Sequence, residues 1–368
     1  MATLYRTYRP QTFDEVIGQE STLTILKNAL LHNTVAHAYL FYGPRGTGKT
    51  TTARIFAKTL NCLTRQADAQ FAKKGIPCNA CEVCRAIDAR HALDIVEIDA
   101  ASHRGIDDIR ELQDIVSSLP SLCLKKIVII DEVHMLTSQA FNALLKTLEE
   151  PPEHVVFILA TTEYEKVPAT IVSRTQRFHF RRLTLQEIRK KLLMVIEKES
   201  LTCDDDALSM IAFLADGSVR DAESLLDQMV HLQKGPITTE AIEKIMGRVD
   251  FAKIVTLSEH IIHNDLKQTL SFLHEIQQQG HNIPQLTKDV INHLRFTLSL
   301  KSNPDLETLF SKELTPQYLE VLKKHAQEIE VEKTIRIIQA LITAHAQMKT
   351  ISLPALPLEL ALIEQLKN

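Results

Sequence analysis

The sequence predicts an α/β fold in the first half of the chain, a parallel sheet with helices on both sides, followed by two all-helical regions. Four short apolar runs, rich in β-branched and aromatic residues, are typical of strands buried on both faces of such a sheet. They lie at residues 38–42, 95–98, 127–130 and 155–159. Apolar residues at helical spacing predict a helix over 141–148, which Pro151 and Pro152 end. Strands that alternate with helices give a sheet wound on both sides.

The strand patterns end near residue 180, and only helical patterns follow. Thr184 and Glu187 have the spacing of a capping box, which predicts that a helix begins there. A chain of 368 residues is long enough for two or three domains. We expect three, namely a sheet domain over 1–180, a small helical domain over 181–243 and a larger helical domain over 244–368.

Charge and hydropathy exclude some locations and partners. The formal net charge is −4, so the chain has no overall positive field for nucleic acid, and a contact with DNA needs local basic clusters. No apolar run approaches the roughly 18 residues of a membrane-spanning helix. The first residues lack the charged and apolar segments of a secretion signal. We therefore expect a cytoplasmic protein without membrane contact.

Glycine is scarce and concentrated in one segment, which predicts a phosphate-binding loop. Only 10 residues are glycine, and three of them fall within 43–48. The segment 43–50 fits the pattern G-x-x-x-x-G-K-S/T between a predicted strand and a predicted helix. In such a loop the backbone N–H groups wrap a phosphate, the lysine reaches the β- and γ-phosphates, and the last hydroxyl binds Mg²⁺. The residues predicted to bind ATP here are Gly43, Pro44, Arg45, Gly46, Thr47, Gly48, Lys49, Thr50 and Thr51.

Two carboxylates complete the expected site. Asp131 and Glu132 directly follow the apolar run 127–130, so they lie where a strand of the sheet ends. Asp131 would hold Mg²⁺ together with Thr50, and Glu132 would be the general base that polarises the attacking water. A chance glycine-rich turn and an ordinary acidic turn are the alternatives to the two motifs. Their occurrence in one chain favours ATP hydrolysis over passive nucleotide binding.

Further motifs occur in the order of a known family. They are Tyr8-Arg9-Pro10 with Val16-Ile17, Asp131-Glu132-Val133-His134-Met135-Leu136, the segment 141–152, Thr162, Ser173-Arg174-Thr175 and Gly217-Ser218-Val219-Arg220-Asp221-Ala222. They resemble the clamp-loader AAA+ ATPases, and segments 131–136 and 141–152 are closely similar to the gamma/tau family of bacterial DNA polymerase III. The resemblance implies an AAA+ fold for the sheet domain, a lid for the second domain and an oligomerising collar for the third.

The resemblance also implies roles for residues outside the phosphate loop. The residues that would border the adenine are Tyr8, Arg9, Pro10, Val16 and Ile17. Thr162 would be a sensor at a strand end, and Arg220 would reach the γ-phosphate from the lid. Arg174 would be an arginine finger that acts in trans on a neighbouring subunit's ATP, where a cation stabilises γ-phosphoryl charge. A surface salt bridge is the alternative for either arginine.

Four of the six cysteines, Cys62, Cys78, Cys81 and Cys84, fall within 23 residues. In a reducing compartment, thiols at such short spacing more often bind metal than form disulfides. Four thiolates suit a structural, tetrahedral Zn²⁺ site. An iron–sulfur cluster and unligated thiols are the alternatives. The resemblance implies a zinc module inserted here, over about 62–84.

The resemblance implies several partners. Segment 99–110 resembles the clamp-loader segment that follows a strand and faces primer–template DNA without reading its sequence, and a loop with solvated charges is the alternative. The other partners would be the remaining clamp-loader subunits, the sliding clamp and the replicative polymerase assembly of the bacterial replisome. Longer family members continue beyond this point, so the chain would be a short form or a piece of a longer one.

The hypothesis that follows is an ATP-hydrolysing motor subunit that loads the polymerase processivity clamp onto primed DNA, with no polymerase activity of its own. One alternative is a non-hydrolysing scaffold subunit of the same assembly, for which a degraded phosphate loop would be expected. Another is a different AAA+ DNA remodeller, such as a helicase loader or a Holliday-junction motor. The cysteine module and the segment 149–152 argue against that second alternative.

Overall fold

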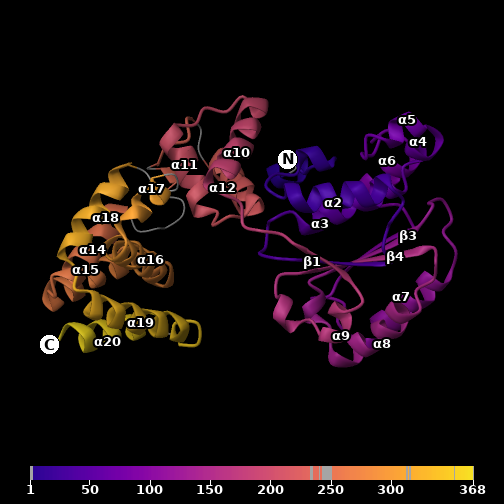
Figure 1. Cartoon of the computed structure of the whole chain (residues 1–368). Helices are drawn as coiled ribbons and strands as arrows, with labels where there is room; N and C mark the ends of the chain where they lie inside the picture. The colour runs from indigo at the N-terminus through magenta and orange to yellow at the C-terminus, as the bar shows by residue number, and fades with distance from the viewer. Residues whose placement is uncertain are drawn as a thin grey trace. The chain divides into compact units, whose positions relative to one another are not determined.

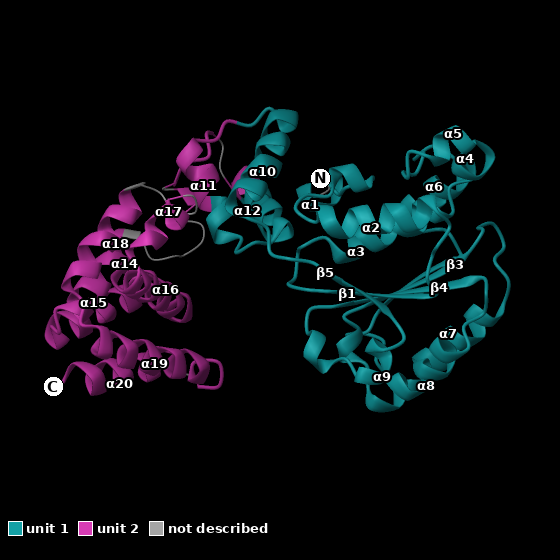
Figure 2. Ribbon diagram, viewed as in Figure 1, with its two compact units in different colours: residues 1–201, 211–228 teal, residues 202–210, 229–368 magenta. Residues whose placement is uncertain are grey.

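The computed structural model describes residues 3–232, 235–239, 241–242, 251–311, 314, 316–351 and 353–367. It divides into two compact units, residues 1–201 with 211–228, and residues 202–210 with 229–368 (Figure 2). The expected boundary at 243–244 lies outside the described residues. Within the described ranges, no helix is both long enough and apolar enough to cross a membrane.

A parallel sheet lies at the centre of the first unit (Figure 1). It has five strands in the order β2-β3-β4-β1-β5. The strands are β1 Ala38–Tyr42, β2 Ile95–Asp99, β3 Lys126–Asp131, β4 Val155–Thr161 and β5 Gln176–His179. The expected parallel α/β fold and the four predicted strands are confirmed. The fifth strand, β5, is an addition that the apolar pattern does not predict, because only Phe178 of its four residues is buried.

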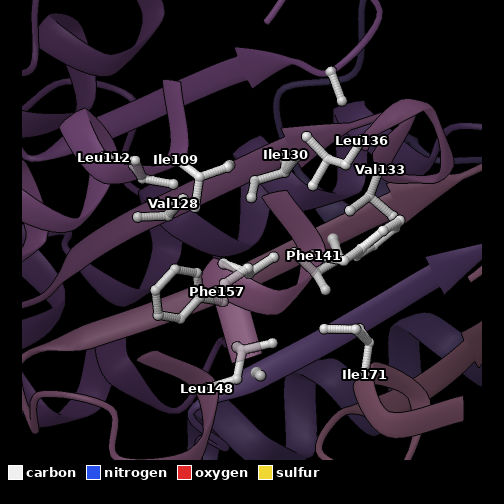
Figure 3. Packing of buried hydrophobic residues seen from close by; sticks show 14 of the residues in the cluster. Ile109, Leu112, Val128, Ile130, Val133, Leu136, Phe141, Leu148, Phe157 and Ile171 are labelled. Carbon is white, nitrogen blue, oxygen red and sulfur yellow. The ribbon is translucent and has the colours of Figure 1, made fainter. Parts of the chain in front are cut away.

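The three inner strands β1, β3 and β4 alternate their side chains between two apolar cores. Val128, Ile130 and Phe157 face one core, shown in Figure 3, while Ile129 and Ile158 face the other. The prediction that every strand is buried on both faces is wrong for β2. This strand lies at the edge of the sheet, and its residues are only partly buried or exposed.

Helices cover both faces of the sheet. One core also contains Ile109, Phe141 and Ile171, which belong to α7 Ile106–Ser117, α8 Ser138–Glu149 and α9 Ala169–Val172. The other core contains Leu26 and Phe56, which belong to α2 Glu20–Leu31 and α3 Lys49–Leu60. The predicted helix at 141–148 is therefore confirmed, and it ends at Glu149 ahead of the two prolines.

The remaining helices up to residue 232 are α1 Leu4–Thr7, α4 Leu63–Ala67, α5 Ala69–Ala72, α6 Glu82–Asp88, α10 Leu185–Glu199, α11 Asp205–Leu214 and α12 Val219–Leu232. Short 3-10 turns lie at Phe13–Glu15, Val133–Met135 and Tyr164–Lys166. The predicted capping box opens α10, since Thr184 Oγ1 accepts from the Glu187 N–H and the Glu187 carboxylate accepts from the Thr184 N–H.

From residue 251 onward every regular element in the described part of the chain is a helix, as expected. The helices are α14 Phe251–Ile262, α15 Leu266–Gln278, α16 Ile283–Ser302, α17 Glu307–Phe310, α18 Pro316–Glu328, α19 Val331–Gln347 and α20 Ala355–Leu366, with a 3-10 turn at Pro304–Leu306. Apolar residues of α14, α15, α16, α19 and α20 share one core. This core belongs to the second unit.

Candidate functional site

A cleft in the first unit brings together motifs that lie far apart in the sequence. Its lining residues are Tyr5, Arg9, Pro10, Glu15, Val16, Ile17, Arg45, Gly46, Thr47, Gly48, Lys49, Thr50, Thr51, Asp131, Glu132, Leu183, Lys191, Val219, Arg220 and Glu223. Most residues predicted to bind ATP are among them. Tyr8, Gly43 and Pro44 are not.

The predicted phosphate loop connects the end of β1 to the first residue of α3. Gly46 has a φ of 74°, and a Cβ at this position would lie 1.8 Å from the Ser218 hydroxyl oxygen. The backbone N–H of Val219 donates to the Gly46 carbonyl over 3.2 Å. A residue with a side chain would push the segment before α12 off the loop, so glycine is required here.

Lys49 is the buried cation of the loop. Its Nζ donates to the carbonyl oxygens of Gly43 (2.7 Å) and Pro44 (2.8 Å), so these two loop residues hold the lysine. Burial lowers the pKa of Lys49, and the negative charges of Glu132 and Asp131 partly offset that effect. The ammonium group is therefore held by the loop, within the electrostatic influence of the two carboxylates.

The hydroxyl of Thr50 and the carboxylate of Asp131 are in direct contact. Thr50 Oγ1 donates to Asp131 Oδ2 over 2.7 Å, which joins the start of α3 to the end of β3. Burial raises the pKa of Asp131, and the hydrogen bond from Thr50 acts in the opposite direction. Hard oxygen ligands of this kind suit Mg²⁺, so this pair fits the metal that the predicted site requires.

Glu132, the predicted general base, contacts Thr162, the predicted sensor. Oε2 of Glu132 accepts from the Thr162 backbone N–H (3.1 Å) and from the Thr162 hydroxyl (2.8 Å). The backbone of Glu132 is left-handed, with a φ of 49°, a conformation that costs a non-glycine residue free energy and is concentrated at functional sites. Thr162 touches the base and is not among the residues that line the cleft.

Sequence reasoning missed a buried ion pair in the cleft. Lys191 of α10 lies 3.6 Å from Glu223 of α12, and both side chains are almost fully buried. Burial raises the pKa of Glu223 to about 7, although Lys191 lowers it. Charged residues on helices normally face solvent, so nothing in the residue pattern marks these two. Tyr5, Glu15, Leu183 and Val219 are the other lining residues that were missed.

Tyr8 and Arg220, both predicted to contact the nucleotide, have contacts with other residues of the chain. The Tyr8 hydroxyl donates to Glu199 (2.6 Å), and its carbonyl accepts from Lys191 Nζ (2.9 Å), so Tyr8 lies behind the cleft lining. Arg220 does line the cleft, and its guanidinium lies 5.3 Å from the centre of the Tyr5 ring.

Arg174 follows α9 and does not line the cleft of its own chain. Its guanidinium pairs with Glu149 over 2.6 Å and donates to the Thr170 carbonyl over 2.9 Å. The side chain is about one third exposed. Within this chain it makes the surface ion pair that was the alternative interpretation.

The structure brings the four clustered cysteines together. The sulfur atoms of Cys62, Cys78, Cys81 and Cys84 all lie within 4.8 Å of one another. Sulfurs that share a tetrahedral Zn²⁺ lie about 3.8 Å apart, from a Zn–S bond of about 2.3 Å, and the Cys78 and Cys84 sulfurs are 3.9 Å apart.

Backbone N–H groups point at these sulfurs. Those of Ala80 and Cys81 donate to Cys78 Sγ (3.4 and 3.2 Å), and that of Cys84 donates to Cys81 Sγ (3.5 Å). Burial raises the pKa of Cys78, but hydrogen bonds from Thr64, Ala80 and Cys81 outweigh it and bring that pKa to about 6. Such donors favour the metal-binding thiolate form of Cys78, whereas burial raises the pKa of Cys62 and of Cys84.

Three protein families match successive parts of the chain. The description "DNA polymerase III, delta subunit" matches residues 18–184, "DNA polymerase III clamp loader subunit, ATPase lid domain" matches 187–235, and "DNA polymerase III subunits gamma and tau domain III" matches 237–367. Among solved structures, the chain is similar to the Thermotoga maritima RuvB Holliday junction branch migration motor. That similarity is 20% identity with a TM-score of 0.47 over 69% of this chain and 79% of that chain.

Curated relatives give a closer match. The chain is 42% identical to the DNA polymerase III subunit tau of Bacillus subtilis, over 98% of this chain and 62% of that protein. It is 34% identical to the DNA polymerase III subunit gamma of Buchnera aphidicola from Acyrthosiphon pisum, over 98% of this chain and 97% of that protein. It thus spans less than two thirds of the tau protein and nearly all of the gamma protein. The chain belongs to the gamma/tau family of DNA polymerase III subunits.

Proposed function

We propose that this chain is an ATP-hydrolysing motor subunit of a bacterial sliding-clamp loader and works within the DNA polymerase III assembly. The observation that carries the proposal is the contact between Thr50 and Asp131, in a cleft that also contains Lys49 and Arg220. A phosphate loop joined in this way to an acidic strand end is the arrangement that P-loop ATPases use. The intact loop also argues against a non-hydrolysing scaffold subunit.

ATP would bind with its phosphates on the loop residues and Lys49. Thr50 and Asp131 would hold Mg²⁺, which neutralises charge on the phosphates. Glu132 would take a proton from the attacking water, and its contact with Thr162 would orient it. Arg220 would contact the γ-phosphate from the lid, and the adenine would lie near Arg9, Pro10, Val16 and Ile17, with Tyr8 supporting them from behind.

Arg174 would act in trans, on ATP bound to a neighbouring subunit. Support comes from its partial exposure and from its position away from its own cleft. Hydrolysis would then depend on assembly, because a single subunit lacks the cation that stabilises γ-phosphoryl charge. The other clamp-loader subunits are thus expected partners.

The four cysteines would hold one structural Zn²⁺ over about 62–84. Support comes from the clustered sulfurs and from the backbone donors that favour the thiolate of Cys78. Four thiolates leave no coordination position for a catalytic water. The zinc module therefore stabilises its part of the first unit and takes no part in hydrolysis.

Segment 99–110 would contact primer–template DNA through its arginines and the start of α7. Support comes from exposed Arg104 and Arg110, and from a helix N-terminus that favours phosphates. Asp107 and Asp108 reduce the local positive charge, so the contact would be weak in one subunit and shared among several.

The domain divisions near 180 and 243, the oligomerising collar over 244–368 and a cytoplasmic location belong to the same proposal.

The test is ATP hydrolysis by the purified chain, alone and with partner subunits, sliding clamp and primed DNA. We expect slow turnover alone and strong stimulation by the complete set. Lys49→Ala should abolish ATP binding, because its ammonium is the cation of the loop. Tight ATP binding by that variant, or absence of hydrolysis by the complete wild-type set, would contradict the proposal.

A further inference from the structure

His134 is buried among polar groups, two residues after the predicted general base. It belongs to the 3-10 turn Val133–Met135, and Val133 and Leu136 on either side of it are part of the core of the first unit. Its own side chain is only 5% exposed. The core thus fixes the turn, and the turn fixes the ring.

Both ring nitrogens of His134 have partners. Nε2 lies 3.2 Å from a carboxylate oxygen of Glu163, and Nδ1 lies 3.0 Å from the hydroxyl oxygen of Thr161. An ionised carboxylate only accepts hydrogen bonds, so Nε2 donates to Glu163. In the neutral ring Nδ1 then accepts from Thr161, whose oxygen in turn accepts from the backbone N–H of Glu163 over 3.0 Å.

Glu163 is itself held in place. Its other carboxylate oxygen pairs with Lys166 over 2.8 Å. The hydrogen bond from Lys166, with a smaller contribution from His134, lowers the pKa of Glu163. Glu163 therefore stays ionised and keeps the orientation of the imidazole fixed from the side away from the core.

The fixed ring lies against Glu132. Nδ1 of His134 is 3.4 Å from Oε2 of Glu132, the same oxygen that accepts both hydrogen bonds from Thr162. In this tautomer both atoms are hydrogen-bond acceptors, so the ring does not hydrogen-bond Glu132. We propose that His134 is a positioning residue for ATP hydrolysis: its ring, held by Glu163, binds the Thr161 hydroxyl and so fixes the strand end from which Thr162 donates to Glu132. This inference rests on the proposed function, because it assigns Glu132 as the general base.

A structural role as a space-filling side chain makes a different prediction. Phenylalanine would fill the same space and would leave the hydroxyl of the fully buried Thr161 without its nitrogen partner. Asparagine can place a polar atom near the position of Nδ1, and glutamine can reach the position of Nε2. The three variants therefore separate packing, contact toward Thr161 and contact toward Glu163.

The experiment measures kcat and KM for ATP in the assembled complex with clamp and primed DNA, and ATP binding and thermal melting of each variant. His134→Phe and His134→Gln should lower kcat about 10- to 100-fold, as expected when a reacting group is misplaced, with KM and ATP binding within about twofold of wild type. His134→Asn should have a kcat much closer to that of wild type than the phenylalanine and glutamine variants have. Glu163→Gln, at an exposed side chain that tolerates change, should lower kcat less, and its effect should vanish in the His134→Phe background.

Glu165→Gln is the matched control, since Glu165 is exposed in the 3-10 turn Tyr164–Lys166 that directly follows Glu163, and it should leave kcat unchanged. A folded His134→Phe protein with wild-type kcat would overturn the inference, as would restoration by glutamine and not by asparagine. If the His134 variants do not fold, a Glu163→Gln protein with unchanged kcat overturns it. Absence of hydrolysis by wild type refutes the proposed function instead, so the two failures are distinguishable.

Discussion

The hydroxyl of Thr50 donates a hydrogen bond to the carboxylate of Asp131 over 2.7 Å, across 81 positions of sequence. The contact joins the first turn of α3 to the last residue of β3, so the two predicted Mg²⁺ ligands are already neighbours in the folded chain. The conformational entropy lost in bringing them together is lost on folding, so ligand binding does not have to compensate for it.

Asp131→Asn should reduce ATP turnover at least about 100-fold, because an amide replaces the charge that the metal and the developing transition state require. Binding of ATP without Mg²⁺ should change little. Steady-state hydrolysis and nucleotide titration measure the two effects. Asp99→Asn is the matched control, since Asp99 ends the neighbouring strand in register with Asp131 and does not line the cleft. Without DNA, it should hydrolyse ATP as wild type does, and equal losses in the two variants would refute a special role of Asp131.

Arg174→Ala should bind ATP normally and lose about 10³-fold or more of the hydrolysis rate in the assembled complex, as for other arginine fingers. In the isolated subunit the same change should have little effect. Arg54→Ala removes another arginine of the first unit, one that pairs with Glu97, and should not affect assembly-dependent turnover. Unchanged turnover of the Arg174 variant in the complex would leave only the ion pair with Glu149 as its role.

Elemental analysis of the purified chain should find about one zinc per molecule. Cys84→Ser should lose the metal and melt at a lower temperature, since Cys84 is buried within the cluster. Cys123 lies outside the cluster, so the Cys123→Ser variant should retain the full amount of zinc. Iron in place of zinc would support a cluster of the iron–sulfur type, and absence of any metal would leave the thiols unligated.

The second unit should lose stability in mild acid because of His293. Burial, and to a smaller extent the charge of His325, lowers the pKa of His293 to about 3, so only the unfolded chain gains a proton as the pH falls below about 6.5. Between pH 7 and pH 5 the free energy of unfolding should therefore fall by about 2 kcal/mol from this residue. Urea unfolding at each pH measures it.

His293→Met should remove most of that pH dependence, whereas His274→Met, at an exposed histidine of the same unit, should retain it. His293 Nε2 and His325 Nδ1 lie 2.9 Å apart. The protonation of one histidine is therefore expected to depend on that of the other. An unchanged slope in the His293 variant would contradict the assignment.

Sequence patterns predicted the inner strands and the phosphate loop because both depend on local residue types. β1, β3 and β4 are buried on both faces and therefore contain continuous apolar runs. β5 was missed because an edge strand with one buried phenylalanine has no such run. Lys191 and Glu223 were missed for a related reason, since only the packing of α10, α12 and the segment around Tyr8 removes their charges from water.

The hydrogen bond from the Val219 N–H to the Gly46 carbonyl has a consequence for how this protein can evolve. It links the loop to the segment that carries Arg220 through main-chain atoms alone, so substitutions of the surrounding side chains leave the link intact. A side chain at position 46 would break it, because its Cβ would lie 1.8 Å from the Ser218 hydroxyl oxygen. This main-chain contact can thus persist in relatives whose side chains differ, while position 46 remains restricted to the smallest residue.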